Sequence, residues 1–343
     1  MKVAVVGASG YTGLELMRIL LRHPEFEVAA ATSEQRAGRP VGDAFPALRG
    51  RTDLVFENAE PQALSGRVEL AFTALPHAAS APTVSALRAA GIRVVDLSAD
   101  YRLRSVDTYR TWYGEHAAPD ALSEAVYGLP ERYREALSGA SLAAAPGCYP
   151  TSALLPLLPL LGAGLVETQG IHIDSKSGVS GAGRSLADGY LFAELDGNCH
   201  AYKPGFAHRH APEIEQEASA VAGGDVRVTF VPHLLPTTRG IATSVYVRPR
   251  GSVADARVAL EAAYADEPFV RVLPEGETPT LQAVRGTNFC DVALFADDRN
   301  DTWILLATLD NLGKGASGQA VQCANLMCGL PETTALLDTG ALP

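Results

Sequence analysis

The first thirteen residues constrain the fold of this chain more than any other stretch. Lys2–Val6 is a short, almost wholly apolar run, and a glycine-rich segment at 7–13 follows it. Next comes a helical pattern of apolar residues, namely Leu14, Leu16, Met17, Leu20 and Leu21. Strand, glycine loop and helix in this order are typical of dinucleotide binding, because glycines let backbone approach a pyrophosphate and the helix N-terminus faces its charge. The spacing is Gly-x-x-Gly-x-x-Gly, a variant fingerprint, so a structural turn that holds no phosphate is the alternative.

The pattern that follows the glycine loop alternates between strands and helices. Apolar runs at 26–32, 70–75 and 92–97 indicate further strands, and 78–90 has a helical pattern. Alternation of this kind predicts a Rossmann-type α/β domain with a parallel sheet. The segments that end two of these strands, 73–77 and 96–100, are expected to line the cofactor cleft.

The end of the second predicted strand indicates which dinucleotide is bound. An acidic residue at this position would accept a hydrogen bond from the ribose 2′-hydroxyl of NAD, but Thr32 and Ser33 stand there, with Arg36 and Arg39 nearby. The pattern favours NADP. Glu34 would reverse the argument if the strand ended one residue later.

Length and charge restrict the class of protein. A chain of 343 residues is long enough for two domains. Its formal net charge of −11 argues against nucleic-acid or anionic-membrane partners, which need clustered positive surface. The N-terminus has no signal-peptide pattern, and the longest apolar run, 153–166, contains two prolines and is too short to span a bilayer. We therefore expect a cytoplasmic protein with no membrane partner.

Cysteine usage points to a reducing compartment. The five cysteines are scattered, with no Cys-x-x-Cys pair, so neither a disulfide framework nor a structural zinc site is expected. Cys148 stands out because it lies between a strand-like run at 140–144 and a predicted helix at 151–161. A helix start favours thiolate over thiol and can hold a developing oxyanion. The alternative is a small buried cysteine in a turn.

The second half of the chain has a different periodicity. Strand-like stretches occur at 170–174, 226–231, 241–247 and 302–309, with one clear intervening helix at 253–264. This pattern predicts an α+β catalytic domain with a mixed sheet. A last helix at 317–327 is expected to pack on the first domain. The predicted domains are 1–146, joined by 313–343, and 147–312.

Two polar clusters in this half carry candidate chemistry. Residues 175–184 form a predicted glycine and serine loop with two cations, suited to wrapping an anion. Residues 203–214 place His208, His210 and Glu213 just before a helix. The His-x-His spacing could suggest a metal site, but no third ligand of matching pattern is visible, so we favour a general acid/base beside the thiol and predict no metal.

Several blocks together resemble the N-acetyl-gamma-glutamyl-phosphate reductases, a family related to aspartate-semialdehyde dehydrogenase. They cover nearly the whole chain, at 7–13, 97–102, 147–151, 175–184, 208–213 and 311–319. The chain departs from the family's usual pattern at Ala211, where threonine is usual, and at Gly313, where valine or a similar residue is usual.

The resemblance implies reduction of N-acetyl-L-glutamyl 5-phosphate to N-acetyl-L-glutamate 5-semialdehyde with NADPH, in arginine biosynthesis. Cys148 would form a thioester with the substrate, and His208 or His210 would move the protons. Glu213 would orient an imidazole, which favours His210 because it is nearer to Glu213 in sequence. The sequence does not decide between the two histidines. The predicted substrate-binding residues are Arg110, Lys176, Arg184 and Ser180, with Arg102 a weaker candidate.

The cofactor-binding residues expected from the glycine loop, the strand ends and the family blocks form one set. They are Gly7, Ser9, Gly10, Tyr11, Thr12, Gly13, Thr32, Ser33, Arg36, Ala74, Pro76, Ser98, Ser177, Gly178 and Asn311. The resemblance further implies a homo-oligomer, a dimer or a tetramer.

Three alternatives remain at this stage. One is the related reductase that acts on aminoadipyl or glutamyl phosphate tethered to a carrier protein, although the Tyr-Pro after Cys148 and the Ser-Lys-Ser-Gly block favour the free acetylated amino acid. Aspartate-semialdehyde dehydrogenase has its cysteine in an asparagine-cysteine-threonine context, which is missing here. A redox-inactive NADP-sensing protein would leave Cys148 and the histidine pair without a role.

Overall fold

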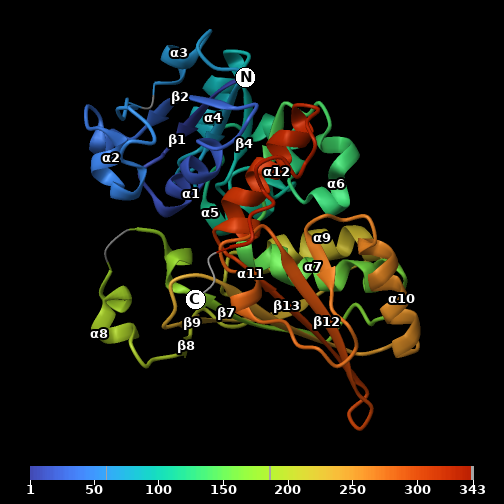
Figure 1. Ribbon diagram of the computed structural model, residues 1–343. Helices are drawn as coiled ribbons and strands as arrows, with labels where there is room; N and C mark the ends of the chain where they lie inside the picture. Colours follow the sequence, from blue (N-terminus) through green and yellow to red (C-terminus); the bar gives the residue numbers. More distant parts are fainter. Residues whose placement is uncertain (59, 185–186, 341–343) are drawn as a thin grey trace. The chain divides into compact units, whose positions relative to one another are not determined.

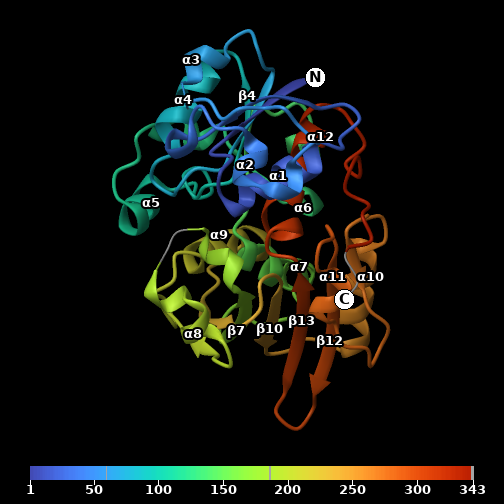
Figure 2. The same cartoon turned by 60° about the vertical axis from the view of Figure 1, so that its left-hand side comes forward.

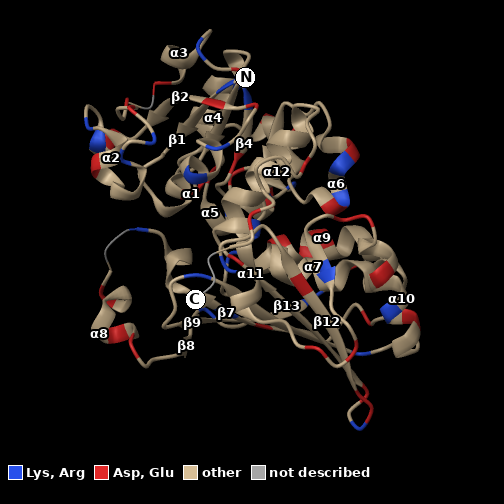
Figure 3. Cartoon of the chain, viewed as in Figure 1, with Lys and Arg blue, Asp and Glu red and all other residues tan. Residues whose placement is uncertain are grey.

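The chain folds into two compact units in the computed structural model, which describes residues 1–58, 60–184 and 187–340. Unit 1 comprises Met1–Pro146 and Ala316–Asp338. Unit 2 comprises Gly147–Gly315 and the described residues that follow Asp338. Charged residues of both signs are distributed over each unit (Figure 3).

Unit 1 is built on a parallel sheet of six strands in the order β2-β1-β3-β4-β6-β5 (Figure 1). The strands are β1 (Lys2–Val6), β2 (Glu27–Thr32), β3 (Leu70–Thr73), β4 (Arg93–Asp96), β5 (Val126–Tyr127) and β6 (Leu142–Ala144). Their side chains are almost continuously buried, as expected for a parallel sheet covered on both faces. The Rossmann-type prediction is confirmed, and five of the six strands lie where apolar runs indicated them, whereas the sequence reading missed β5.

The main helices of unit 1 are α1 (Tyr11–Leu20), α4 (Ala81–Ala89), α5 (Val106–Tyr113), α6 (Pro130–Leu137) and α12 (Gly318–Met327). Shorter helices are α2 (Val41–Ala44) and α3 (Pro61–Leu64). The helix predicted at 78–90 begins three residues later, because 74–80 forms an irregular connection in which Ala78 has φ +63°.

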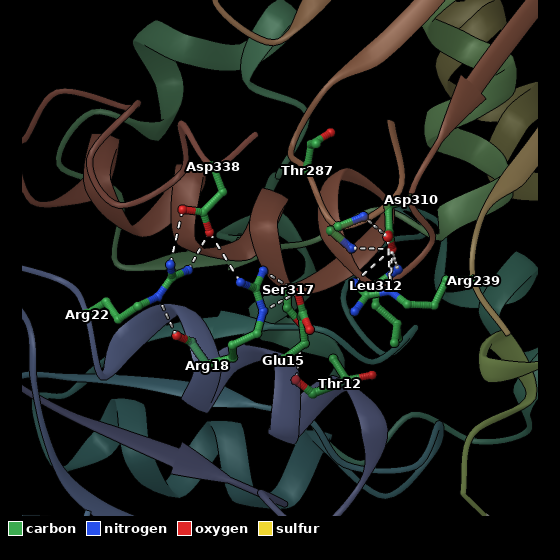
Figure 4. Close-up of polar contacts among 12 residues, drawn as sticks. Thr12, Glu15, Arg18, Arg22, Arg239, Thr287, Asp310, Leu312, Ser317 and Asp338 are labelled. Carbon is green, nitrogen blue, oxygen red and sulfur yellow. Dashed lines mark hydrogen bonds and ion pairs between the residues drawn. The ribbon is translucent and has the colours of Figure 1, made fainter. Parts of the chain in front are cut away.

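The C-terminal segment of unit 1 returns to the first helix of the same unit. Helix α12 packs against α1, α6 and β4. Ser317 Oγ donates to the carbonyl of Thr12 at 2.9 Å, and the Asp338 carboxylate accepts hydrogen bonds from Arg18 and Arg22 on α1 (Figure 4). These contacts fix the C-terminal segment on the helix that follows the glycine loop.

Unit 2 is built on a mixed sheet of seven strands in the order β11-β12-β13-β10-β7-β9-β8. The strands are β7 (Ile171–Gly178), β8 (His200–Ala201), β9 (Val228–Leu235), β10 (Ile241–Val247), β11 (Val270–Val272), β12 (Cys290–Asp297) and β13 (Thr302–Leu309). The predicted mixed sheet is confirmed. The sequence reading missed β8, β11 and β12, and it took 175–178 for loop where the structure extends β7 to Gly178.

Three long helices cover one face of this sheet (Figures 1 and 2). They are α7 (Cys148–Gly162), α9 (Ala211–Ala222) and α10 (Val253–Tyr264), and the shorter helices of the unit are α8 (Phe192–Leu195) and α11 (Leu281–Val284). Residues of β7, β9 and β10 alternate between buried and more exposed positions. One face of the sheet is therefore packed, and the other face carries partly exposed side chains.

Helix α7 continues through two prolines. Pro159 has no N–H to donate to the carbonyl of Leu155, and the hydroxyl of Tyr264 on α10 donates to that carbonyl instead. The packed neighbour thereby satisfies a backbone acceptor that the helix itself leaves open, and α7 stays continuous from Cys148 onward.

Two further findings concern membrane-spanning helices and disulfide bonds. Among the described residues, no helix is both long enough and apolar enough to cross a bilayer. All five cysteines are thiols in the structure, with none in a disulfide.

Candidate active site and nucleotide loop

Cys148 is the first residue of α7. Its neighbour Gly147 is the N-cap in an extended conformation (φ −64°, ψ 150°), and the cysteine is half-buried. The helix begins three residues before the predicted start at Thr151, so the thiol lies within the first turn. First-turn N–H groups are not used within a helix and carry partial positive charge, which favours a thiolate.

Helix α9 brings its first turn to Gly147. The Gly147 N–H donates to Glu213 Oε1 at 2.8 Å, and Glu213 is almost fully buried. A β-carbon at position 147 would lie only 2.6 Å from His210 Nε2. The structure therefore brings His210 and Glu213 to the residue before Cys148. Glu213 thus binds a backbone N–H group, a contact that the sequence analysis did not predict.

His208 lies in a cluster of aromatic rings. Its ring centroid is 4.8 Å from that of His210, 5.8 Å from Tyr149 and 5.6 Å from Tyr202. Its Nδ1 accepts a hydrogen bond from the backbone N–H of His210 at 3.1 Å. Burial, together with the charges of Lys203 and Arg209, lowers the pKa of His208 to about 4. His208 is therefore neutral at pH 7.

Two tyrosines beside the histidines were missed by sequence reasoning. The Tyr202 hydroxyl donates to the Tyr149 hydroxyl at 3.0 Å, and Tyr149 donates to the carbonyl of His233 at 3.3 Å. Burial raises the pKa of both tyrosines, so both are protonated donors. Tyr149 is adjacent to Cys148 in sequence, but nothing in the spacing relates Tyr202 to it.

A chain of buried hydroxyls joins α7 to the sheet. Thr243 Oγ1 on β10 lies 2.7 Å from Ser152 Oγ on α7 and 2.8 Å from Ser175 Oγ on β7. Because side chains alternate along a strand, Lys176 lies on the opposite face of the sheet from Ser175, where it pairs with Asp174 at 2.8 Å. The structure does not bring Lys176, a predicted substrate cation, to the face that carries α7.

The other predicted residues of the 175–184 block lie around Asn311. Ser177 and Ser180 are buried, and Asn311 Nδ2 donates to Ser180 Oγ at 2.9 Å while its Oδ1 accepts from the Gly240 N–H at 2.7 Å. A β-carbon on Gly178 would lie 2.8 Å from the backbone nitrogen of Arg239. The side-chain amide of Asn311 thus ties segments of unit 2 together.

The predicted arginines have different surroundings. Arg110 on α5 is half-exposed and pairs with Asp107 at 2.7 Å and Glu115 at 2.8 Å. Arg102 is buried and donates to the carbonyls of Ala145 and Leu97 at 2.7 and 2.9 Å. Arg184 is exposed and precedes residues 185–186, which lie outside the described part of the chain.

The glycine loop of unit 1 has the close contacts that a nucleotide loop requires. Gly7 has φ +84°, and a β-carbon there would lie 2.6 Å from the carbonyl oxygen of Ala74. A β-carbon on Gly13 would lie 2.5 Å from the backbone of Ala8. At Gly10, the N-cap of α1, a β-carbon would meet no atom within 4 Å apart from those of adjacent residues, and no side chain caps this helix. The open backbone at this helix N-terminus, followed by Tyr11 and Thr12, fits a dinucleotide phosphate.

The end of β2 is closed by hydroxyls. The Gly7 N–H donates to Thr32 Oγ1 at 3.2 Å, and Ser33 Oγ donates to Ser9 Oγ at 2.9 Å. Strand β2 ends at Thr32 as expected, and Glu34 to Arg36 form a short 3₁₀ turn in which Arg36 is half-exposed. Thr32 and Ser33 therefore occupy the strand end, and Glu34 and Arg36 lie in the turn that follows.

The ends of β3 and β4 are organised by buried carboxylates. Asp96 accepts hydrogen bonds from the hydroxyls of Thr73, Ser80 and Ser98 at 2.6 to 2.7 Å. Ser98 is fully buried and also accepts from the Asp100 N–H, so its hydroxyl is engaged by protein groups. In the 74–80 connection, Ala74 is partly buried and Pro76 is exposed.

The described residues contain no cluster of three or more His, Cys, Asp or Glu that could hold a metal ion. The His-x-His pair is instead packed in the aromatic cluster beside α7.

Comparison with known proteins identifies the family of this chain. The profile described as "Semialdehyde dehydrogenase, NAD binding domain" matches residues 2–140, and "Semialdehyde dehydrogenase, dimerisation domain" matches residues 148–311. The N-acetyl-gamma-glutamyl-phosphate reductase of Citrifermentans bemidjiense is 53% identical over 337 residues, which cover 98% of this chain and 97% of the relative. The chain belongs to the N-acetyl-gamma-glutamyl-phosphate reductase family. The family member of Geobacter sulfurreducens is 51% identical over 345 residues and covers 100% of both chains.

Solved structures more distant than the N-acetyl-gamma-glutamyl-phosphate reductases share the fold. Aspartate semialdehyde dehydrogenase II of Vibrio cholerae, complexed with ASA, has a TM-score of 0.73 at 18% identity, covering 96% of this chain and 98% of that one. The aspartate semialdehyde dehydrogenase of Candida albicans, solved with NADP, has a TM-score of 0.67 at 18% identity, covering 95% and 98%.

Proposed function

We propose that this chain reduces N-acetyl-L-glutamyl 5-phosphate to N-acetyl-L-glutamate 5-semialdehyde and inorganic phosphate, a step of arginine biosynthesis. The observation that carries the proposal is the position of Cys148 at the start of α7. His210 and Glu213 lie against Gly147, the residue before it. Relatives that carry the reductase name are about half identical to the chain over its full length.

The chemistry begins with the Cys148 sulfur. Its thiolate attacks the acyl carbon, the bond from that carbon to the phosphate oxygen breaks, and phosphate leaves, so a thioester forms on the enzyme. First-turn N–H groups of α7 stabilise the oxyanion of each tetrahedral intermediate. When bound, NADPH supplies the hydride that reduces the acyl carbon. The carbon–sulfur bond then breaks to release the aldehyde and regenerate the thiolate.

We assign the proton movements to His210. Its ring lies against Gly147, one residue from the nucleophile, whereas His208 lies among the rings of Tyr149 and Tyr202. His210 takes the proton from the Cys148 thiol before attack and gives a proton back to the sulfur after the carbon–sulfur bond breaks, which restores the thiol. Glu213 holds the Gly147 N–H and thereby fixes the start of α7. His208 supports the ring of His210.

The proposed cofactor is NADP, held by the glycine loop of unit 1. The backbone at Gly10 and the first turn of α1 would bind the pyrophosphate, because this helix end has no side-chain cap. Strand β2 ends on Thr32, and Arg36 lies in the turn that follows, which supports binding of a 2′-phosphate. Arg184 and Arg110 remain proposed contacts for the substrate anion, and Ser180 a proposed hydroxyl contact.

We further propose that the protein works in the cytoplasm as a homo-oligomer. The family description of residues 148–311 as a dimerisation domain supports self-association. The proposal is a dimer or a tetramer.

The function is tested by phosphate-dependent NADP reduction with N-acetylglutamate semialdehyde as substrate. The wild-type protein should turn over this substrate and leave aspartate semialdehyde unused. Cys148→Ala should remove turnover while NADPH still binds, and Cys199→Ala, at an exposed thiol, is the matched control that should keep it. Retained turnover in Cys148→Ala would overturn the proposal.

A further inference from the structure

One buried acid–base pair in unit 2 has no role in the proposed chemistry. Asp310 follows β13 and is fully buried. Its carboxylate pairs with Arg239, whose Nε lies 2.9 Å and Nη2 3.0 Å from carboxylate oxygens (Figure 4). A buried carboxylate costs several kcal/mol of free energy unless it is paired and hydrogen-bonded, on the order of the desolvation penalty for one ion. We therefore examined which groups the buried Asp310 carboxylate holds in place.

The Asp310 carboxylate also binds backbone from two segments. It accepts from the N–H groups of Leu312 at 2.8 Å and Gly313 at 3.0 Å, which close a turn directly after the strand. It accepts from the Gly286 N–H at 2.6 Å, in the segment before β12. Asp310 therefore holds the 310–315 turn against Gly286, and Arg239 holds Asp310.

The turn ends against the nucleophile. The Gly315 N–H donates to the carbonyl of Asp310 at 2.9 Å, so the same residue closes the turn at both its side chain and its backbone. A β-carbon at position 315 would lie 2.9 Å from the β-carbon of Cys148, which is closer than two side chains can approach. The backbone of Gly315 is thus packed directly on the cysteine side chain.

We propose that the Asp310–Arg239 pair is a positioning device for Cys148, because it fixes the turn whose Gly315 packs against the β-carbon of the cysteine. The inference rests on the proposed role of Cys148 as nucleophile. Asp310 and Arg239 act through the turn, so they are positioning residues and not catalytic ones. Loss of the pair lets the turn shift, and the thiol then leaves the first-turn N–H groups that stabilise its thiolate.

The test uses Asp310→Asn and Arg239→Lys in the full chain. A displacement of about 1 Å at a reacting group can lower the rate on the order of 100-fold, so we expect kcat to fall by about 30-fold or more in Asp310→Asn. The KM for NADPH should stay within about twofold, because the glycine loop of unit 1 is unchanged. Arg239→Lys keeps the charge and should recover part of kcat relative to Arg239→Met.

Alkylation of Cys148 by iodoacetamide, followed on its own peptide, separates positioning from stability. In Asp310→Asn the pH profile of alkylation should shift upward, with a rate at pH 7 about tenfold lower, since less thiolate is stabilised. The matched control is Asp291→Asn, at a buried carboxylate of the same unit that pairs with Arg271 at 2.6 Å. This control should lower the melting temperature and leave the alkylation profile unchanged.

Gly315→Ala tests the same contact if Asp310→Asn fails to fold. This variant keeps the ion pair and presses a methyl group onto Cys148, so it should reproduce the losses in kcat and alkylation. A folded Asp310→Asn protein whose Cys148 reacts as in Asp291→Asn would overturn the inference, as would a fully active Gly315→Ala. An active Cys148→Ala variant would instead overturn the proposed function, so the two failures are distinguishable.

Discussion

The glycine loop of unit 1 and the cysteine site of unit 2 are assembled in different ways. The loop is made by neighbours in sequence, with Gly7, Gly10 and Gly13 spaced along one strand–turn–helix connection. The cysteine site is made by residues far apart in the chain. Gly147 and Glu213 are 66 residues apart, and Asn311 and Ser180 are 131 apart. A local pattern reveals the first kind of site, and only the fold reveals the second.

The largest expected effect concerns the cysteine site of unit 2. Gly147→Ala places a methyl group 2.6 Å from His210 Nε2 and 2.9 Å from Pro150 Cδ, so His210 must move away from the start of α7. We expect kcat to fall by about 100-fold or more, on the order of the effect of a misplaced general acid or base. Steady-state rates of Gly147→Ala and of the control Gly224→Ala, whose β-carbon meets open space, measure this. Equal rates would show that the histidine does not need this close approach.

The contrast between the two regions also explains what the sequence reading achieved. Five of the six strands of unit 1 and the position of Cys148 close to a helix start were predictable, because apolar runs and glycine spacing are local signals. Lys176 was assigned to a loop, because Ser-Lys-Ser-Gly has turn composition, yet sheet pairing extends β7 through it and directs it to the other face. Tertiary pairing overrode local propensity there.

The Asp310–Arg239 pair left no signal in the sequence. An aspartate before asparagine and an arginine before glycine are ordinary loop residues, and their 71-residue separation is set by the order of strands in the sheet. The same holds for Tyr202, which the loop before α9 brings to Tyr149.

A second prediction concerns the departure from the family pattern at Gly313. A β-carbon there would lie 2.2 Å from the carbonyl oxygen of Thr287, so the family's usual valine does not fit this chain without a shift of backbone. Gly313→Val should lower the free energy of unfolding by about 2 to 3 kcal/mol, in the range of overpacked positions. Urea denaturation measures the change. An unchanged midpoint would mean that the 287 segment yields readily.

A third prediction concerns the glycine loop of unit 1. Gly10→Ala adds a methyl group where the protein has open space, so the melting temperature should stay within about 2 °C, as for other exposed substitutions. The methyl group should obstruct the phosphate, and NADPH affinity should fall about tenfold, or 1.4 kcal/mol. Fluorescence titration with NADPH gives the affinity. Gly13→Ala, which clashes with Ala8 backbone, should lower both quantities. Unchanged NADPH affinity in Gly10→Ala would remove the phosphate from this helix end.

The smallest expected effect is a pH dependence of stability from His208. Its pKa is lowered to about 4 in the folded state, below the ordinary value of 6.5, so the unfolded chain binds more protons between these values. The free energy of unfolding should therefore fall as the pH drops from about 6.5 to 4, by on the order of 1 kcal/mol after allowance for partial exposure. His208→Gln should remove this contribution, as a comparison of denaturation at pH 7 and pH 5 would show. An identical slope in both proteins would contradict it.

The covalent step through Cys148 is tested most directly by a burst experiment with N-acetylglutamate semialdehyde and NADP in the absence of phosphate. The account predicts one equivalent of NADPH per active site, an acyl adduct on the Cys148 peptide by mass spectrometry, and full turnover once phosphate is added. Absence of the burst and of the adduct, in a protein that turns over normally with phosphate, would contradict it.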